Sequence, residues 1–290
     1  MNTFITTILG TLLFALLAPI VGCLISGVDR IISARMQGRV GPPLLQPYWD
    51  VRKLLEKERF SVNSVEGTYV IASLVFAVLA GGIFFSGGNF LLCVFVITLS
   101  SLFFILAAYS TRSPFAEAGA ARETMQVMSY EPMVLLCAMA LYLTAGSFDV
   151  ADLLSLRHPI LCFAWPVFLG LLFVLTIKLR KSPFDISNSH HAHQELVSGI
   201  TTEMSGPTLA KVEVMHWYET VLFMGWVGMF FLYASPVGWI AAIVAVVVVY
   251  LLEIWIDNNF ARVKWQSMLK WAWIVALIAG GINITVLAFM

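Results

Sequence analysis

Long runs of apolar residues, separated by short polar segments, cover most of the 290-residue chain. A transmembrane helix needs about 20 predominantly apolar residues. Runs of about that length occupy residues 4–27, 68–86, 89–109, 123–145, 160–178, 213–233, 236–256 and 270–289. Continuous runs of this kind predict helices, because backbone groups in lipid must be hydrogen-bonded internally. The pattern therefore predicts an all-α polytopic membrane protein with about eight transmembrane helices, forming one domain over residues 1–290.

The polar segment after the first run changes character at Gly41-Pro42-Pro43, which breaks the chain. Beyond this point apolar side chains recur at helical spacing, with charged side chains between them. The apolar positions are Tyr48, Val51, Leu54 and Leu55. This pattern predicts an amphipathic helix at the membrane surface, either as an anchor or as a strip on which a soluble partner docks. The first run has neither a basic leader nor a small-residue cleavage site, so we expect it to be retained.

Composition and charge agree with a membrane location. Hydrophobic residues make up 60% of the chain and charged residues only 12%. Of the 17 lysines and arginines, all except Arg157 fall in or beside the segments that follow the first, third, fifth and seventh runs. By the positive-inside rule, this bias predicts cytoplasmic polar loops and both termini on the outside. The chain shows no internal repeat, which disfavours a transporter built from duplicated halves.

The cysteines do not form a metal-binding pattern. Cys23, Cys93, Cys137 and Cys162 stand singly in apolar segments, without a CxxC or Cys/His cluster. Zinc sites and iron–sulfur clusters need such grouped ligands. We therefore expect buried, unreactive thiols and no cofactor bound by this chain.

Polar residues interrupt the run 123–145. Glu123, Gln126 and Tyr130 share one helical stripe, and Glu131 lies further along the axis. An acidic residue at the centre of a membrane helix costs about 2.5–3.5 kcal/mol. Two hypotheses stay open: a structural ion pair, with Arg122 as the obvious partner of Glu123, or a proton path in a water-filled interior.

Titratable residues also share one stripe at the start of the run 213–233. They are Glu213, His216 and Glu219. Histidine titrates near neutrality, so this stripe is either a proton relay or a cluster at the membrane surface. Near the end of the following run, Glu253 and Asp257 would repel each other unless a cation such as Arg262 lies between them.

The loop KSPFDISNSHHAHQELVSGITTEMSG, residues 181–206, is polar although apolar runs flank it. A metal site at His190, His191 and His193 is disfavoured, because adjacent histidines point in different directions. A hydrolase is disfavoured because Ser187 and Ser189 lack a nucleophile-elbow context. The loop is either a titratable cluster that exchanges protons with a redox partner or a polar docking loop.

Three ordered motifs resemble the H-type membrane subunit of respiratory complex I, also called NADH dehydrogenase subunit 1. They are ARMQGRVGPP at 34–43, ARETMQVMSYE at 121–131, and RKSPFDIS at 180–187 followed by HQELVSGITTEMSGP at 193–207. The resemblance spans nearly the whole chain. Quinone-linked subunits have further acidic residues where this chain has NSHHAHQ. The stretch SHHAHQE resembles instead the membrane subunit of Ech-type energy-converting NiFe hydrogenases, and is similar in kind to formate hydrogenlyase subunits.

The resemblance assigns roles to matching positions. It places Arg35, Arg39 and Asp185 at the cytoplasmic junction. The loop histidines His190, His191 and His193 belong to the same loop and junction, but they have no assigned counterpart in complex I. The resemblance implies an acidic funnel, feeding a proton path toward antiporter-like subunits, made by Glu131, Glu195 and Glu203. Either Glu213 or Glu219 corresponds to a further glutamate of the family, and Glu123 has no assigned counterpart in complex I.

The resemblance implies the membrane anchor and coupling subunit of a ferredoxin-linked, proton-reducing hydrogenase in the cytoplasmic membrane of a prokaryote. The implied partners are the NiFe large and small subunits, an iron–sulfur subunit, an antiporter-like membrane subunit, ferredoxin and the lipid bilayer, with no nucleic acid. The NiFe centre and the iron–sulfur clusters would reside in these partners. The coupling ion, H⁺ or Na⁺, stays open. Alternatives are the quinone-chamber subunit of a respiratory complex I, a stand-alone ion transporter and a purely structural anchor.

Overall fold

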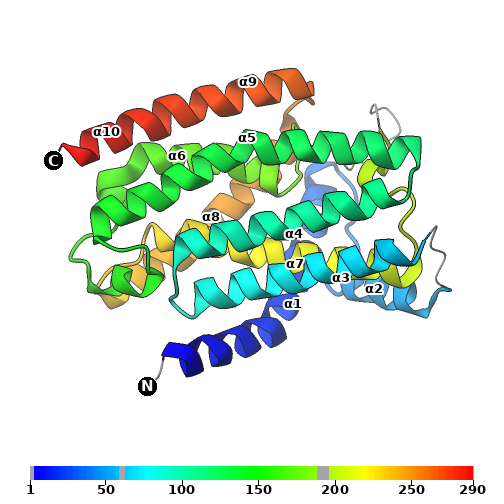
Figure 1. Cartoon of the computed structure of the whole chain (residues 1–290), viewed down its shortest axis with the longest axis horizontal. Coiled ribbons are helices and arrows are strands. Elements are labelled where there is room, and N and C mark those ends of the chain that lie inside the picture. The colour runs from blue at the N-terminus through cyan, green and yellow to red at the C-terminus, as the bar shows by residue number, and fades with distance from the viewer. Residues whose placement is uncertain (1–2, 59–62, 188–195, 290) are drawn as a thin grey trace.

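The computed structural model describes residues 3–58, 63–187 and 196–289, which fold largely into long helices lying alongside one another (Figure 1). The long helices are α1 Thr3–Met36, α3 Ser64–Phe85, α4 Phe90–Ser110, α5 Pro114–Ala145, α6 Leu161–Lys178, α7 Gly206–Met229 and α8 Pro236–Asn259. The last long segment is α9 Trp265–Val275, which continues through the π-helical turn η3 Ala276–Gly281 into α10 Ile282–Ala288. The short helices are α2 Gln46–Glu56, η1 Val150–Ser155 and η2 Gly199–Thr201.

The outer surface of the bundle is apolar. On α1 and α8, large side chains face outward, with Leu12 64% and Ile243 65% exposed. Such extensive apolar exposure is expected where lipid replaces water. Within the described residues, seven helices combine the length and composition of a membrane span: α1, α3, α4, α5, α6, α8 and the segment Trp265–Ala288. The polytopic all-α prediction is confirmed.

The helix α7 is the exception among the long helices. It carries Lys211, Glu213, His216 and Glu219, and it packs in the interior against α1, α2, α3 and α8. A central helix surrounded by others does not need an apolar outer face. The predicted span 213–233 is therefore largely helical, as part of α7, but the count of eight spans stays a prediction.

The polar segments gather at one end of the bundle. In Figure 1 the start of α1, at the bottom, and the end of α10, at the top, both lie toward the left, and α2 lies at the right with the links between α4 and α5 and before α7. We call this right-hand end the loop end. Which side of the membrane it faces stays a prediction.

Helix α5 begins earlier than its apolar run indicates. Pro114 occupies the first turn after the extended Ser113, and the helix ends at Gly146 in the left-handed conformation, with φ 78°. Proline is favoured at a helix start because its φ is already helical, and glycine is favoured just past the end because it tolerates positive φ. The alanine-rich segment 116–121 favours helix without being apolar enough to indicate a span. As a result Glu123 is an interior residue of the helix.

The segment predicted to be an amphipathic helix is helical, as α2. Val51 is buried and Leu54 half-buried against Cys23 of α1 and Ala210 and Trp217 of α7. Arg52 and Glu56 form an exposed ion pair with an N···O distance of 3.0 Å. Part of the apolar face thus packs on the bundle rather than on lipid, and its role at the membrane surface stays a prediction.

Candidate functional site: a buried ionic centre at the loop end

The segment KLRKSPFD, residues 178–185, leaves α6 and passes through the interior of the loop end. Its backbone turns at Arg180, which has φ 51° and lies in the left-handed region that non-glycine residues rarely adopt. The Lys181 N–H donates to the Thr176 carbonyl at 3.2 Å, and the Gln126 amide donates to the Phe184 carbonyl at 2.6 Å. Such backbone conformations persist only when the surroundings hold them, and they concentrate at functional sites.

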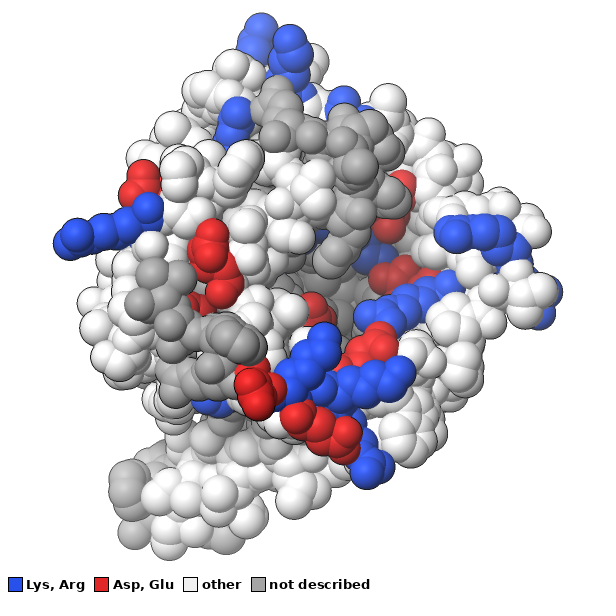
Figure 2. Space-filling model, turned by 90° about the vertical axis from the view of Figure 1, so that its right-hand side faces the viewer, with Lys and Arg blue, Asp and Glu red and all other residues white. Residues whose placement is uncertain are grey.

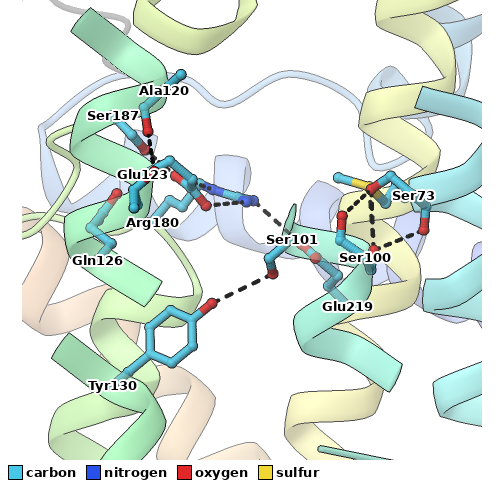
Figure 3. Close-up of polar contacts among 12 residues, drawn as sticks. Ser73, Ser100, Ser101, Ala120, Glu123, Gln126, Tyr130, Arg180, Ser187 and Glu219 are labelled. Atoms are coloured by element: carbon cyan, nitrogen blue, oxygen red, sulfur yellow. Dashed lines mark hydrogen bonds and ion pairs between the residues drawn. The ribbon is translucent and has the colours of Figure 1, made fainter. Parts of the chain in front are cut away.

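Arg180 joins two buried carboxylates from different helices, as Figure 3 shows. Its Nη2 lies 2.8 Å from Glu123 Oε1 on α5, and its Nη1 lies 3.3 Å from Glu219 Oε2 on α7. Only 14% of the Arg180 side chain, 4% of Glu123 and 6% of Glu219 are exposed. The Ser187 hydroxyl donates a further hydrogen bond to Glu123. We call Glu123, Arg180 and Glu219 the ionic triad.

The triad carries an excess of one negative charge if all three members are ionised. Burial alone would lower the pKa of the Arg180 guanidinium, but Glu123 and Glu219 outweigh this effect and hold that pKa above its ordinary value. Arg180 is therefore a permanent cation. Burying this set without good pairing would cost several kcal/mol, so its geometry must be maintained by the fold.

Close backbone packing holds Ser187 beside Glu123. The Ile200 N–H of η2 donates to the Ser187 carbonyl at 3.0 Å. A Cβ on Gly119 of α5 would lie 2.2 Å from the Ile200 nitrogen, and one on Gly199 would lie 2.0 Å from the Ser187 oxygen. Only glycine permits both approaches. In the motif GITTEMSG, Gly199 and Ile200 therefore contribute close backbone packing that positions Ser187.

A second set of polar contacts fixes the rest of the segment. Lys181 Nζ lies 2.8 Å from Asp29 Oδ2 of α1, and the Tyr250 hydroxyl of α8 donates to the same oxygen at 3.2 Å. The Ser182 N–H donates to Asp257 Oδ1 at 2.8 Å. After α8, Arg262 Nε lies 3.1 Å from each oxygen of Asp185. These contacts tie the segment to α1 and α8, whereas the triad ties it to α5 and α7.

These groups line a cavity of about 290 Å³ at the loop end, which we call the main cavity of this end. Its charged or titratable lining residues are Asp29, Lys178, Arg180, Lys181, Asp185, Glu213, His216, Glu219, Asp257 and Arg262. A second cavity of about 120 Å³ shares Asp29, Lys181, Glu213 and His216 with it. Figure 2 looks onto this end and shows acidic and basic side chains gathered around a hollow in the surface. A polar space of this size accommodates several water molecules.

The structure brings together five of the titratable residues singled out from the sequence. Glu213, His216, Glu219 and Asp185 line the main cavity, and Glu123 adjoins it through Arg180. The stripe of Glu123, Gln126 and Tyr130 faces the interior, and all three are buried.

Other predicted residues lie away from the cavity. Glu131 is half-buried on α5 and acts electrostatically on Lys178. Glu203 is half-buried between η2 and α7, and Arg35 and Arg39 are exposed near the end of α1. The remaining predicted residues, Glu195, His190, His191 and His193, lie outside the described residues.

Three expectations about individual contacts are corrected. Glu123 pairs with Arg180 rather than Arg122, whose guanidinium lies 5.5 Å from the centre of the Trp265 ring. Arg262 binds Asp185, so it does not separate Glu253 from Asp257. Cys162 is exposed on α6 instead of buried like the other cysteines, because its position faces away from the bundle.

The cations at the centre are the functional residues that sequence reasoning misses. In the sequence, Lys178, Arg180 and Lys181 count only as loop charges, and neither Asp29 nor Tyr250 stands out. The available signal is three cations within four residues, directly after an apolar run. In the described part of the chain, no group of three or more His, Cys, Asp or Glu side chains is placed to hold a metal ion. The arrangement supplies side chains that are able to exchange protons around a charged interior cavity.

Known proteins share this sequence and fold. The chain matches the family described as NADH dehydrogenase over residues 8–288. Formate hydrogenlyase subunit 4 of Escherichia coli (strain K12) is 27% identical, with 92% of this chain and 94% of that protein covered. The H-type subunit of the NADH-quinone oxidoreductase of Geobacillus thermodenitrificans is 29% identical, with 97% and 90% covered. Hydrogenase-4 component C of Escherichia coli (strain K12) is 32% identical over 64% of this chain and 63% of that protein.

One solved structure shows the fold. A chain of the membrane-bound sulfane sulfur reductase, an archaeal respiratory membrane complex, superposes with a TM-score of 0.85 at 20% identity, covering 97% of this chain and 99% of that chain. The relatives named above are subunits of hydrogenase-type and complex I-type membrane complexes. Since the family match runs through nearly the whole sequence, this chain belongs to the NADH dehydrogenase subunit 1 family, which includes the H-type subunits of complex I.

Proposed function

We propose that this chain is the membrane anchor and coupling subunit of an energy-converting NiFe hydrogenase. The observation that carries the proposal is the charged cavity at the loop end, which leads to the buried ionic triad. A tether alone does not need five acidic side chains, four cations and a histidine around one interior space, because each buried charge is costly. The relatedness to formate hydrogenlyase subunit 4 and hydrogenase-4 component C supports the hydrogenase assignment.

In this proposal the metal centres reside in partner subunits. Ferredoxin gives electrons to an iron–sulfur subunit and the NiFe large and small subunits, which dock on the loop end and reduce protons to hydrogen. The loops of this chain are cytoplasmic, both termini are outside, and the membrane is the cytoplasmic membrane of a prokaryote. Arg35 and Arg39 are exposed near the loop end, where they would contact the docked arm.

Coupling follows from the effect of a nearby electron on the charged cavity. A change of charge in the docked arm alters which of Asp185, Glu213, His216 and Glu219 hold protons. A proton then passes toward Glu131 and an antiporter-like subunit, which moves H⁺ or Na⁺. Moving one charge against 100 mV takes about 2.3 kcal/mol. A pKa change of two units on one carboxylate supplies about 2.7 kcal/mol, so one such group suffices.

A quinone-chamber subunit of a respiratory complex I is the second candidate. It is favoured by the match to the H-type subunit of NADH-quinone oxidoreductase over 97% of this chain. The lining of the main cavity argues for the first candidate, since nine formally charged side chains hold water better than an apolar quinone ring.

Deleting this chain from its native complex distinguishes the candidates. We expect the hydrogenase subunits to leave the membrane fraction, and ion uptake by inverted vesicles during ferredoxin-driven hydrogen evolution to fall to background. Hydrogen evolution from an artificial viologen donor should persist, because its metal centres lie in the partners. Purified complex that reduces quinone and evolves no hydrogen would instead establish the second candidate.

A further inference from the structure

Among the described residues that line the main cavity, Lys178 is the cation that forms no ion pair with a carboxylate. The other buried or half-buried cations of the cavity, Arg180, Lys181 and Arg262, each have a carboxylate oxygen within 3.3 Å. The Lys178 Nζ lies instead 3.7 Å from the centre of the Tyr130 ring and 5.0 Å from that of Phe223, and the residue is only 8% exposed.

Lys178 also stands between two spaces. It lines the main cavity at the loop end, and it lines a deeper pocket of about 10 Å³ together with Ser101, Glu123, Tyr130 and Glu219. A pocket of this size is just large enough for one water molecule, and its polar lining offers the hydrogen-bond partners that a buried water needs. Arg180 and Glu219 line both spaces as well, but they are paired with each other.

The Lys178 ammonium is held by weaker contacts than the ion pairs of Arg180 and Lys181. The charged form is attracted by the ring faces and by the more distant carboxylates of Glu219, Glu123 and Glu131, and it is repelled by Arg180. A cation–π contact is worth about 0.5–2 kcal/mol, which is less than the loss on breaking a buried ion pair. Lysine differs from arginine in giving up its proton readily when buried.

We propose that Lys178 is the proton carrier between the loop-end cavity and the inner pocket. In one turnover the Lys178 ammonium passes one Nζ proton, through a water molecule in the inner pocket, to a carboxylate further along the proposed proton path. It thereby becomes a neutral amine. It then takes one proton from water in the main cavity and is an ammonium again, so protons balance. This role rests on the proposed coupling function and names the residue that performs the transfer.

The test uses Lys178→Arg and Lys178→His in the intact complex in liposomes, with ion uptake divided by hydrogen evolved as the readout. Arginine keeps the charge but does not release its proton. We therefore expect this ratio to fall by about tenfold or more in Lys178→Arg, as expected for a barrier increase of about 1.4 kcal/mol or more. Histidine titrates at lower pH, so Lys178→His should keep coupling, with its alkaline limit moved toward acid. The matched control is Lys211→Arg, a half-buried lysine of α7 outside the cavity lining.

Each outcome decides the role of Lys178. A Lys178→Arg complex that couples like wild type at every pH overturns it. If neither variant assembles, the wild-type pH profile decides: the ratio must fall on the alkaline side, where the amine no longer holds its proton, and a flat profile refutes the proposal. Wild-type complex that moves no ions would refute the coupling function itself, which is a different failure.

Discussion

Replacing Arg180 by methionine is expected to abolish assembly of the subunit at neutral pH. Methionine fills similar space, but it leaves Glu123 and Glu219 buried without their common cation. Removing one partner of a buried ion pair costs about 3–5 kcal/mol. That is a large share of the roughly 5–15 kcal/mol by which a folded domain is stable. The measurement is the amount of this chain recovered in the assembled complex after mild detergent extraction.

The triple variant Arg180→Met, Glu123→Gln, Glu219→Gln is the matched rescue. It removes the two stranded carboxylates together with the cation, and the glutamines retain the shape of the site. Replacing a whole buried charge cluster by neutral residues is often neutral or stabilising. We expect assembly to recover to near the wild-type amount. Wild-type assembly of Arg180→Met alone would show that the triad does not hold the loop end together.

Glu219→Gln alone is expected to separate hydrogen evolution from ion movement. The amide oxygen still accepts a hydrogen bond from Arg180, so the fold is retained, but the exchangeable proton of the carboxyl group is lost. Glu219 lines both the main cavity and the inner pocket. Ion uptake per hydrogen should fall by about tenfold or more, which corresponds to about 1.4 kcal/mol or more in a barrier.

Glu56→Gln is the control for this prediction. Glu56 is an exposed residue of α2 that pairs with Arg52, and surface pairs of this kind contribute at most about 1 kcal/mol. It should assemble and couple as the wild type does. Equal ion uptake by Glu219→Gln and wild type would exclude Glu219 from the path.

The sequence predicts the helices well because apolar length is a local property. The stripe of Glu123, Gln126 and Tyr130 is buried as its spacing predicts, since a helix fixes which side chains share a face. The helix boundaries are less predictable. α5 begins at Pro114 because alanine-rich sequence favours helix, although it is not apolar enough to mark a span.

The centre of the site is less predictable because it is built from contacts between residues that are distant in the sequence. Glu123 meets Arg180 across 57 positions, and Lys181 meets Asp29 from the first helix. The neighbour Arg122 is the natural partner of Glu123 by sequence alone, yet adjacent residues of a helix point about 100° apart. The left-handed turn at Arg180, which sets the course of the segment, has no local signal such as glycine.

The central claim is that the ionic triad couples electron transfer to ion translocation. The dependence of hydrogen evolution on membrane potential tests this claim most directly. Wild-type complex and the triple variant would be placed in liposomes under an increasing imposed potential that opposes ion movement. If the ionic triad couples electron transfer to ion translocation, wild-type hydrogen evolution slows as the potential rises, and that of the triple variant does not. Equal slowing of both complexes, or no slowing of the wild type, would contradict the claim.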